Sequence, residues 1–216
     1  MLHSIFMEEK KAVRAQMRRL LSEISEKEHD YCSHKASVVL MKSDLFISAQ
    51  VVLSYMAMPS ELDPFRLTAA ALHAYKVLAV PRCVPHTNRL DFFCLKACDG
   101  REQFDSQFTT GAFGVREPKP LAAALLKGDS LKQKKICVVV PGLAFTERGS
   151  RLGHGKGYYD GYLAWMKEQA FEHDAELSLV GFCFDFQILD ALPVESHDIR
   201  MDYLCCPSGI IRCPHC

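Results

Sequence analysis

The sequence predicts an α/β fold, a single-domain three-layer α/β/α sandwich with a mixed, mostly parallel sheet. Helix and strand patterns alternate along the chain, as they do in such sandwiches. Two strand patterns, "ICVVVP" at residues 136–141 and "LSLVGFCF" at 177–184, are largely apolar, which is typical of strands covered on both faces. The 216 residues, 49% of them hydrophobic, suffice for one core, so a single domain over residues 1–216 is expected.

Two helices are expected first. Between residues 6 and 23, apolar residues recur on one helical face, namely Val13, Met17, Leu20 and Leu21. The sequence "SEKE", residues 25–28, is a capping box because a serine stands three positions before a glutamate. It predicts the start of a second helix that runs toward Met41.

The patterns then alternate. "QVVLSYMAM", residues 50–58, predicts a strand. Asp63 and Pro64 are suited to the N-cap and the first position of a helix through "DPFRLTAAALHAYK". Strands are expected at 77–81 and 90–95, followed by a loop-rich section to about Gly128.

The second half repeats the alternation. The strand at 136–141 is followed by a glycine-rich loop, a helix over "YYDGYLAWMKEQAF" (158–171) and the strand at 177–184. This order predicts a Rossmann-like sheet, in which ligands usually bind beyond the carboxyl ends of the strands. The tail from about residue 207 to 216 is expected to be loose.

Composition excludes some partners. Lysine plus arginine and aspartate plus glutamate both total 26, so no net charge attracts the chain to nucleic acid or to an anionic membrane. The apolar run at the start is too short for a signal peptide or a membrane span, which predicts a cytoplasmic protein. The ten cysteines are expected to be free thiols, and the chain is expected to be a monomer.

The glycine-rich loop fits neither common nucleotide-binding fingerprint. A P-loop needs Ser or Thr after its lysine, but Gly157 follows Lys156, and three glycines in strict alternation do not match G-x-G-x-x-G. Glycines, the cations Arg151 and Lys156, and a following helix N-terminus nevertheless suit a polyphosphate. The alternative is a glycine-rich surface turn with two solvated cations.

A family resemblance narrows this choice. "VPGLAFTERGSRLGHGKGYYDGYL", residues 140–163, resembles the signature of the 5-formyltetrahydrofolate cyclo-ligase family, also called methenyltetrahydrofolate synthetases. Shorter segments resemble that family in the same order. They are Lys10 with Arg14, "YMAMPSELDP" (55–64), "VPR" (80–82), "FGVREP" (113–118) and "HDIRMD" (197–202).

The resemblance implies a ligase that uses ATP and magnesium. It would convert 5-formyltetrahydrofolate to 5,10-methenyltetrahydrofolate through phosphorylation of the formyl oxygen, releasing ADP and phosphate. Catalysis of such a transfer is mostly alignment and charge stabilisation, which a cationic loop and a metal can provide.

The resemblance also implies site residues. The ATP-binding set is Lys10, Arg14, Arg151, Leu152, Gly153, His154, Gly155, Lys156, Gly157, Tyr158 and Tyr159, of which Lys156, Tyr158 and Tyr159 are the catalytic candidates. The folate-binding set is Met56, Met58, Glu61, His154, Gly155, Lys156, Gly157 and Tyr158. Asp160 and Asp198 would bind Mg2+, which takes one or two carboxylates along with phosphate oxygens and water.

Each of these groups also has a purely structural interpretation. Lys10 and Arg14, on one helix face, can be a solvated basic face, and the methionines can be core residues. Asp198 can be a turn aspartate. Two positions depart from the family pattern, since His154 replaces an arginine of some relatives and Cys83 an aromatic residue.

Three further possibilities remain. The tail has metal-like spacing at Cys213, His215 and Cys216, but a single Cys-x-x-Cys gives little support for zinc. The fold could serve a non-catalytic protein that binds folate or nucleotide. It could also serve a sugar-phosphate isomerase or acyl-transferase, because fold alone does not set function.

Overall fold

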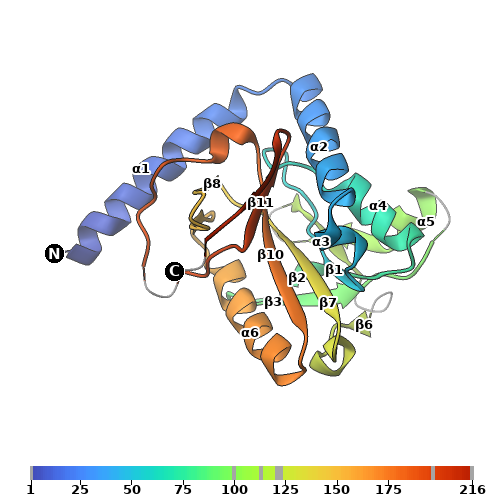
Figure 1. The fold of residues 1–216 in the computed structure, drawn as a ribbon. Coiled ribbons are helices and arrows are strands. Elements are labelled where there is room, and N and C mark those ends of the chain that lie inside the picture. The colour runs from blue at the N-terminus through green and yellow to red at the C-terminus, as the bar shows by residue number, and fades with distance from the viewer. Residues whose placement is uncertain (1, 99–100, 112–113, 120–123, 196–197, 215–216) are drawn as a thin grey trace.

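The computed structural model describes residues 2–98, 101–111, 114–119, 124–195 and 198–214 (Figure 1). The helices are α1 (Leu2–Ser22), α2 (Glu26–Met41), α3 (Asp44–Ile47), α4 (Phe65–His73), α5 (Arg101–Ser106) and α6 (Tyr158–Glu172), with 3-10 turns at Gly128–Leu131 and Asp185–Gln187. The strands are β1 (Val51–Leu53), β2 (Val77–Cys83), β3 (Leu90–Cys94), β4 (Phe108–Thr110), β5 (Arg116–Pro118), β6 (Ala124–Leu125), β7 (Lys135–Val140), β8 (Ala144–Phe145), β9 (Arg151–Leu152), β10 (Glu176–Phe182), β11 (Tyr203–Cys206) and β12 (Gly209–Arg212).

A mixed, mostly parallel sheet organises the fold, as predicted. Its order is β12-β11-β10-β7-β1-β2-β3-β6, an eight-stranded sheet. The central strands from β11 to β2 run parallel to one another. Antiparallel strands flank them, with β12 at one edge and β3 and β6 at the other. The carboxyl ends of the central strands therefore meet at one edge, where ligands are expected.

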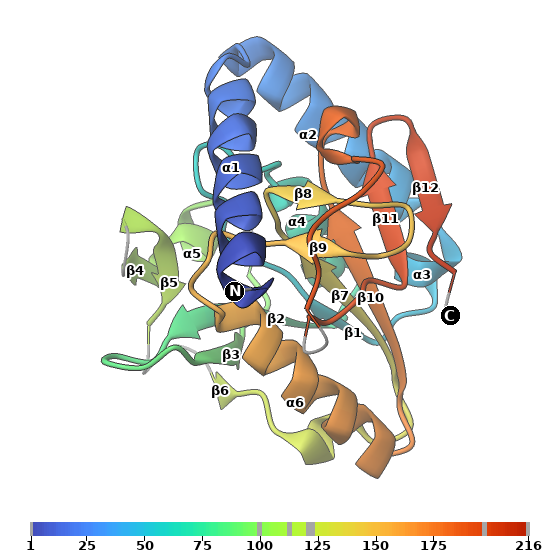
Figure 2. The same cartoon turned by 90° about the vertical axis from the view of Figure 1, so that its left-hand side faces the viewer.

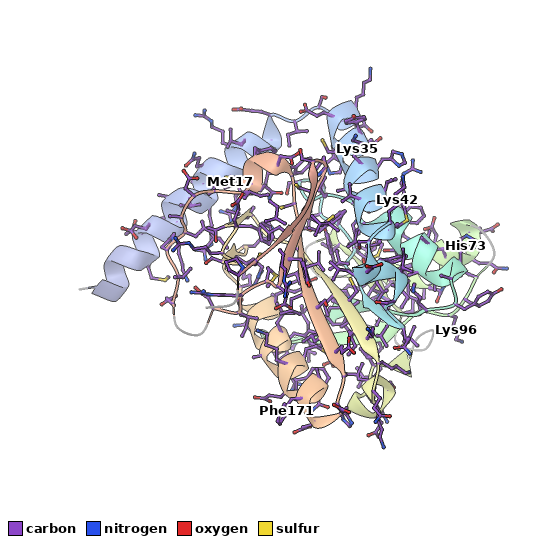
Figure 3. All side chains as sticks on the ribbon, viewed as in Figure 1. Met17, Lys35, Lys42, His73, Lys96 and Phe171 are labelled. Atoms are coloured by element: carbon purple, nitrogen blue, oxygen red, sulfur yellow. The ribbon has the colours of Figure 1, made fainter. Side chains whose placement is uncertain are left out.

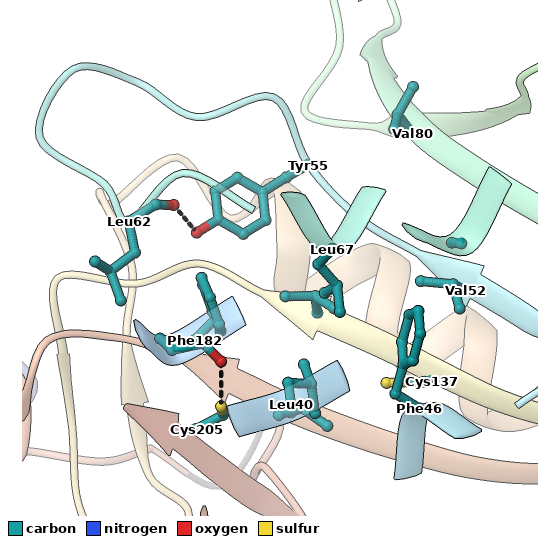
Figure 4. Close-up of a cluster of buried hydrophobic side chains, with 14 of the residues drawn as sticks. Leu40, Phe46, Val52, Tyr55, Leu62, Leu67, Val80, Cys137, Phe182 and Cys205 are labelled. Carbon is teal, nitrogen blue, oxygen red and sulfur yellow. Dashed lines mark hydrogen bonds between the residues drawn. The ribbon is translucent and has the colours of Figure 1, made fainter. Parts of the chain in front are cut away.

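Helices cover both faces of this sheet. On β1, Val52 faces a core that includes residues of α1, α2 and α4, among them Leu40 and Leu67 (Figure 4). Its neighbours Val51 and Leu53 face the opposite core, which α6 covers. All three valine and leucine side chains of β1 are fully buried, as expected for a strand covered on both sides. Helix–sheet–helix layering is thus confirmed.

Side-chain exposure follows the same layers. Met17 lies on the inner side of α1 and is fully buried, whereas Phe171, near the C-terminal end of α6, is 89% exposed (Figure 3). Among the described residues, no helix is long and apolar enough to cross a membrane.

Helix α2 begins at the predicted capping residue, whereas α4 begins one residue later than predicted. The Glu28 amide donates to Ser25 Oγ (3.3 Å), so Ser25 caps α2 as predicted. The Phe65 amide donates to Asp63 Oδ1 (2.9 Å), but α4 begins at Phe65, with Pro64 in the N-cap position. The prediction that placed Asp63 at the N-cap was therefore one residue too early.

The first strand is shorter than predicted. Instead of residues 50–58, β1 covers Val51–Leu53, and Ser54 makes one more bond toward β2 through its amide and Ala79 O (2.9 Å). The chain then leaves the sheet because the buried Tyr55 hydroxyl donates to Leu62 O (2.5 Å) and closes a loop (Figure 4). The methionines that follow Tyr55 consequently lie in a loop, beyond the carboxyl end of β1.

The C-terminal tail is not loose where the structure describes it. Strands β11 and β12 form a hairpin in which Cys206 is paired with Gly209 across a two-residue turn, Pro207 and Ser208. Cys213 is buried, and its amide donates to Asp202 O (2.9 Å). Pairing along the sheet edge thus overrides the polar, cysteine-rich composition that suggested a free tail. His215 and Cys216 lie outside the described residues.

The cysteines within the described part of the chain are free thiols, as predicted. Burial raises the pKa of the Cys213 thiol to about 11, followed by smaller effects of Asp202 and Glu147. No group of three or more His, Cys, Asp or Glu residues that could hold a metal ion exists among the described residues.

Candidate active site

A cavity of about 540 Å³ opens beyond the carboxyl ends of β1, β2 and β7. All the site residues predicted from the sequence line it, namely Lys10, Arg14, Met56, Met58, Glu61, Arg151, Leu152, Gly153, His154, Gly155, Lys156, Gly157, Tyr158, Tyr159, Asp160 and Asp198. A volume of this size is typical of small-molecule sites. The structure therefore brings together in one place residues that are distant in the sequence.

The long helix α1 forms one wall. Figure 2 shows it running alongside β8 and β9. Its inner face is anchored in the core through Met17 and Leu21. The spacing i, i+4, i+8 then places Lys10, Arg14 and Arg18 in one row, and all three line the cavity.

Lys10 is buried between two carboxylates. Its Nζ donates to Glu195 Oε2 (2.8 Å) and to Asp198 Oδ2 (2.9 Å), and its side chain is only 7% exposed. Burial lowers the pKa of Lys10, but the hydrogen bonds and charges of Glu195 and Asp198 together outweigh that effect, so the pKa is raised. The ammonium therefore stays charged.

Asp198 has a structural role as well. Its Oδ2 accepts the Glu195 amide (2.7 Å), while its own amide donates to Glu195 O (3.1 Å). It is thus a turn aspartate that also faces the cavity. This turn fixes both carboxylates against Lys10.

Arg151 joins the start of the glycine loop to α6. Its Nη2 donates to Asp160 Oδ1 (2.5 Å) and its Nη1 donates to Pro141 O (3.3 Å). The Arg151 side chain is 3% exposed, and its guanidinium lies 5.7 Å from the Tyr159 ring centroid. Arg151 is therefore held mainly by protein groups, and Asp160 is paired with a cation.

The glycine loop is positioned by backbone geometry. Gly155 (φ +96°) and Gly157 (φ +72°) adopt left-handed conformations that favour glycine. Gly157 is the N-cap of α6, so the positive end of that helix faces the loop. Lys156, between the two glycines, is exposed at the cavity.

Glu61 lines the cavity from the loop after β1 and is 7% exposed. Its Oε2 accepts the Met58 amide (3.0 Å), and its Oε1 lies 3.1 Å from His154 Nε2. His154 thus links the glycine loop to this carboxylate.

The two tyrosines at the start of α6 stay neutral. Burial raises the pKa of Tyr159 well above its ordinary value, with a further contribution from Glu61. Tyr158 lies beside the Cys83 thiol, whose pKa is raised to about 11 by burial and by Glu117. Neither tyrosine is therefore suited to act as a general base near neutral pH.

Some other residues of the cavity were not predicted as site residues, namely Arg18, Tyr55, Arg116 and Glu195. Glu117, which also lines the cavity, was expected to shape the folate pocket without a role of its own. Tyr55 and Arg116 stand in segments that resemble the family, and Arg18 continues the four-residue spacing of Lys10 and Arg14. Glu195 reaches Lys10 across 185 positions, which no local pattern reveals.

Comparison with known proteins gives a consistent result. The model of the 5-formyltetrahydrofolate cyclo-ligase family matches residues 6–207. A probable 5-formyltetrahydrofolate cyclo-ligase of Schizosaccharomyces pombe is 30% identical over 166 residues, covering 74% of this chain and 76% of its own. The 5-formyltetrahydrofolate cyclo-ligase of Saccharomyces cerevisiae is 27% identical, covering 94% and 97%.

Solved structures agree. The NMR structure of Aquifex aeolicus 5,10-methenyltetrahydrofolate synthetase has a TM-score of 0.70 and 26% identity, covering 96% of this chain and 94% of its own. A Mycoplasma pneumoniae 5,10-methenyltetrahydrofolate synthetase, at 18% identity and a TM-score of 0.63, shares the fold over 92% of this chain and 98% of its own. The chain belongs to the 5-formyltetrahydrofolate cyclo-ligase family.

Proposed function

We propose that this member of the 5-formyltetrahydrofolate cyclo-ligase family converts 5-formyltetrahydrofolate and ATP into 5,10-methenyltetrahydrofolate, ADP and phosphate in the cavity described above. The observation that carries the proposal is the convergence of the family's motif residues on a single cavity of about 540 Å³. That cavity has a cationic side, at α1 and the glycine loop, and a side with a buried carboxylate, Glu61.

The chemistry follows from the substrate. A formyl oxygen is a poor leaving group, so its attack on the γ-phosphorus of ATP, with departure of ADP, turns it into a phosphate ester. N10 of the folate then attacks the formyl carbon and loses its proton, and the carbon–oxygen bond breaks as phosphate leaves. The protein's main task is to align the two substrates and stabilise charge on the moving phosphoryl group.

The cationic side suits the polyphosphate. Arg14 and Lys156 supply positive charge beside Lys10, whose own charge is balanced by Glu195 and Asp198, and the left-handed glycines expose backbone amides beside the start of α6. In this proposal Lys156 contacts the transferring phosphoryl group, where a cation stabilises the transition state most.

The Glu61 side suits the pterin. A desolvated carboxylate can accept hydrogen bonds from an aminopyrimidine edge, and Met56 and Met58 add an adaptable apolar wall. His154 would have to yield or share Glu61 Oε1 when the pterin binds. Tyr158 and Tyr159, at the junction of loop and α6, separate the two substrates.

Asp160 and Asp198 fit a magnesium ion. Both line the cavity, and each is paired with a cation, Lys10 for Asp198 and Arg151 for Asp160, so a magnesium ion would have to share these carboxylates or displace the cations. Two carboxylates leave ligand positions for ATP phosphate oxygens and water, the combination that Mg2+ prefers. When bound, the ion would neutralise phosphate charge.

The decisive experiment is to mix the purified protein with 5-formyltetrahydrofolate, ATP and magnesium. The near-ultraviolet absorbance of the methenyl product should appear, together with ADP, and should be absent when ATP is omitted. If no product forms with any divalent metal but ATP or folate still binds, the protein is a non-catalytic binding protein. Turnover of a sugar phosphate without ATP would favour the isomerase alternative.

The assembly and location are further proposals. We propose a monomer in the cytoplasm, for which light scattering should give a mass near 24.3 kDa and a fluorescent fusion a diffuse cytosolic signal. A mass twice as large, or an organellar signal, would contradict these two statements.

A further inference from the structure

Two arginines of α1 hold consecutive carbonyl groups of the glycine loop. Arg14 Nε donates to Gly153 O (3.0 Å), and Arg18 Nη2 donates to His154 O at the longer distance of 3.4 Å. Both contacts join residues more than 130 positions apart in the sequence. They fix the direction of two successive peptide planes relative to α1, which Figure 2 shows alongside β9.

A fixed carbonyl also fixes the next amide. No peptide bond among the described residues is cis, and in a trans peptide the N–H lies on the opposite edge from the C=O. The amides of His154 and Gly155 therefore face away from α1. In the part of the chain that the structure describes, the amides of residues 154–157 donate to no protein acceptor.

Gly155 makes the close contact with α1 possible. A Cβ atom at this position would lie 3.3 Å from Arg14 Cζ and 3.4 Å from Arg14 Nε, so the guanidinium packs directly on the bare backbone. The left-handed conformation of Gly155 independently disfavours other residues. The loop and the arginine row are thus built to fit each other.

We propose that Arg18 is a positioning residue for ATP: with Arg14, it holds the glycine loop so that the amides of residues 154–157 are presented to the nucleotide phosphates. This inference rests on the proposed function. Arg18 acts through the His154 carbonyl. Because this hydrogen bond is long and Arg18 is exposed, we expect its loss to have a moderate effect on nucleotide affinity. Arg19, the next residue, offers a matched control because it lies in the same helix but pairs with Glu23 (3.3 Å) and is 78% exposed.

The test compares Arg18→Ala with Arg19→Ala, which remove the same charge. Arg18→Ala should raise the Kd for ADP and the KM for ATP about three- to tenfold, the range expected for one hydrogen bond, while the folate KM stays within about twofold. Arg19→Ala should leave all three constants unchanged. Hydrogen exchange at saturating ADP should show weaker protection of residues 154–157 in Arg18→Ala than in Arg19→Ala.

Measurements at high ionic strength distinguish positioning of the loop by Arg18 from simple charge attraction between Arg18 and the nucleotide. A purely coulombic contribution of Arg18 should vanish at high ionic strength, whereas a positional one should persist. Equal nucleotide constants for the two variants, or a difference that disappears in high salt, would overturn the inference. If the wild-type protein does not bind ADP or ATP at all, the proposed function itself fails. Thermal unfolding of both variants verifies folding, and Arg18→Gln replaces Arg18→Ala if the latter is unfolded.

Discussion

The two ends of the parallel sheet carry hollows of similar size but different character. At the carboxyl ends, the cavity of about 540 Å³ contains charged residues that are nearly buried, namely Lys10, Glu61 and Arg151, whose side chains are 7%, 7% and 3% exposed. At the amino ends, a hollow of about 430 Å³ is lined by surface groups such as the pair Lys135 and Glu176, whose side chains are 51% and 73% exposed.

The difference lies in how the charges are held. Lys10 meets Glu195 across 185 positions, so tertiary structure keeps both groups away from water. At the amino end, Gln50 Oε1 accepts the Lys135 amide (2.8 Å), a bond that mainly completes the start of the neighbouring strand β7. Volume alone therefore does not identify an active site, whereas desolvated charges joined by long-range contacts do.

The largest expected effect comes from Lys156→Ala at the carboxyl end. Removing the cation proposed to contact the transferring phosphoryl group should lower kcat/KM for ATP by about 100-fold or more. Folate binding should change by no more than about twofold. Steady-state kinetics and equilibrium dialysis with folate measure the two quantities, and equal losses in both would contradict the assignment.

Glu61→Gln should sharpen the distinction between the two sides of the cavity. Losing the carboxylate charge should raise the folate KM about tenfold, because a charge-assisted hydrogen bond becomes a neutral one. The ATP KM should change much less. The same increase in both constants would mean that Glu61 acts on the loop through His154 and not on the folate.

Asp198→Asn should affect magnesium specifically. The substitution keeps the turn geometry but removes one carboxylate charge, so the magnesium concentration for half-maximal rate should increase several-fold. Titration of activity with magnesium at saturating ATP and folate measures this. A titration identical to that of the wild type would return Asp198 to a purely structural role.

The smallest effect is expected at the amino end. Glu176→Gln removes an exposed ion pair, which should alter the free energy of unfolding by less than about 1 kcal/mol. Activity should be unchanged under all substrate conditions. Denaturant unfolding and the methenyl assay verify this, and a loss of activity would show that the contrast between the two ends is not functional.

Strong local signals explain what the sequence predicted well. The capping box at Ser25, the apolar strands β7 and β10, and the loop glycines all depend on near neighbours in the sequence. The early end of β1 and the edge strand β12 were predicted incorrectly although their partners are near in sequence: Tyr55 bonds Leu62 seven positions on, and β12 pairs with β11 across the turn Pro207–Ser208, which lacks the glycine or asparagine typical of two-residue hairpins.

The candidate site likewise contains residues that the sequence predicted and residues that it did not. Physical reasoning from spacing indicated an anion-binding loop at Gly153 to Gly157, while the family resemblance supplied the functional interpretation of Glu61 and Asp198. Neither the spacing of residues nor the family resemblance indicated that Glu195 contacts Lys10, because the two are 185 positions apart and no local sequence pattern reports such a contact.

The contact between Lys10 and Asp198, 188 positions apart, has a consequence for biosynthesis. Closing so long a loop before the intervening sheet has folded costs conformational entropy, so we expect this contact to form after the sheet. A nascent chain emerging from the ribosome holds Lys10 without its carboxylates until the segment after β10 has been translated. The ATP side of the site is therefore completed only after residue 198 has been synthesised, and a product that ends before residue 195 would have no carboxylates to pair with Lys10 and no ligase activity.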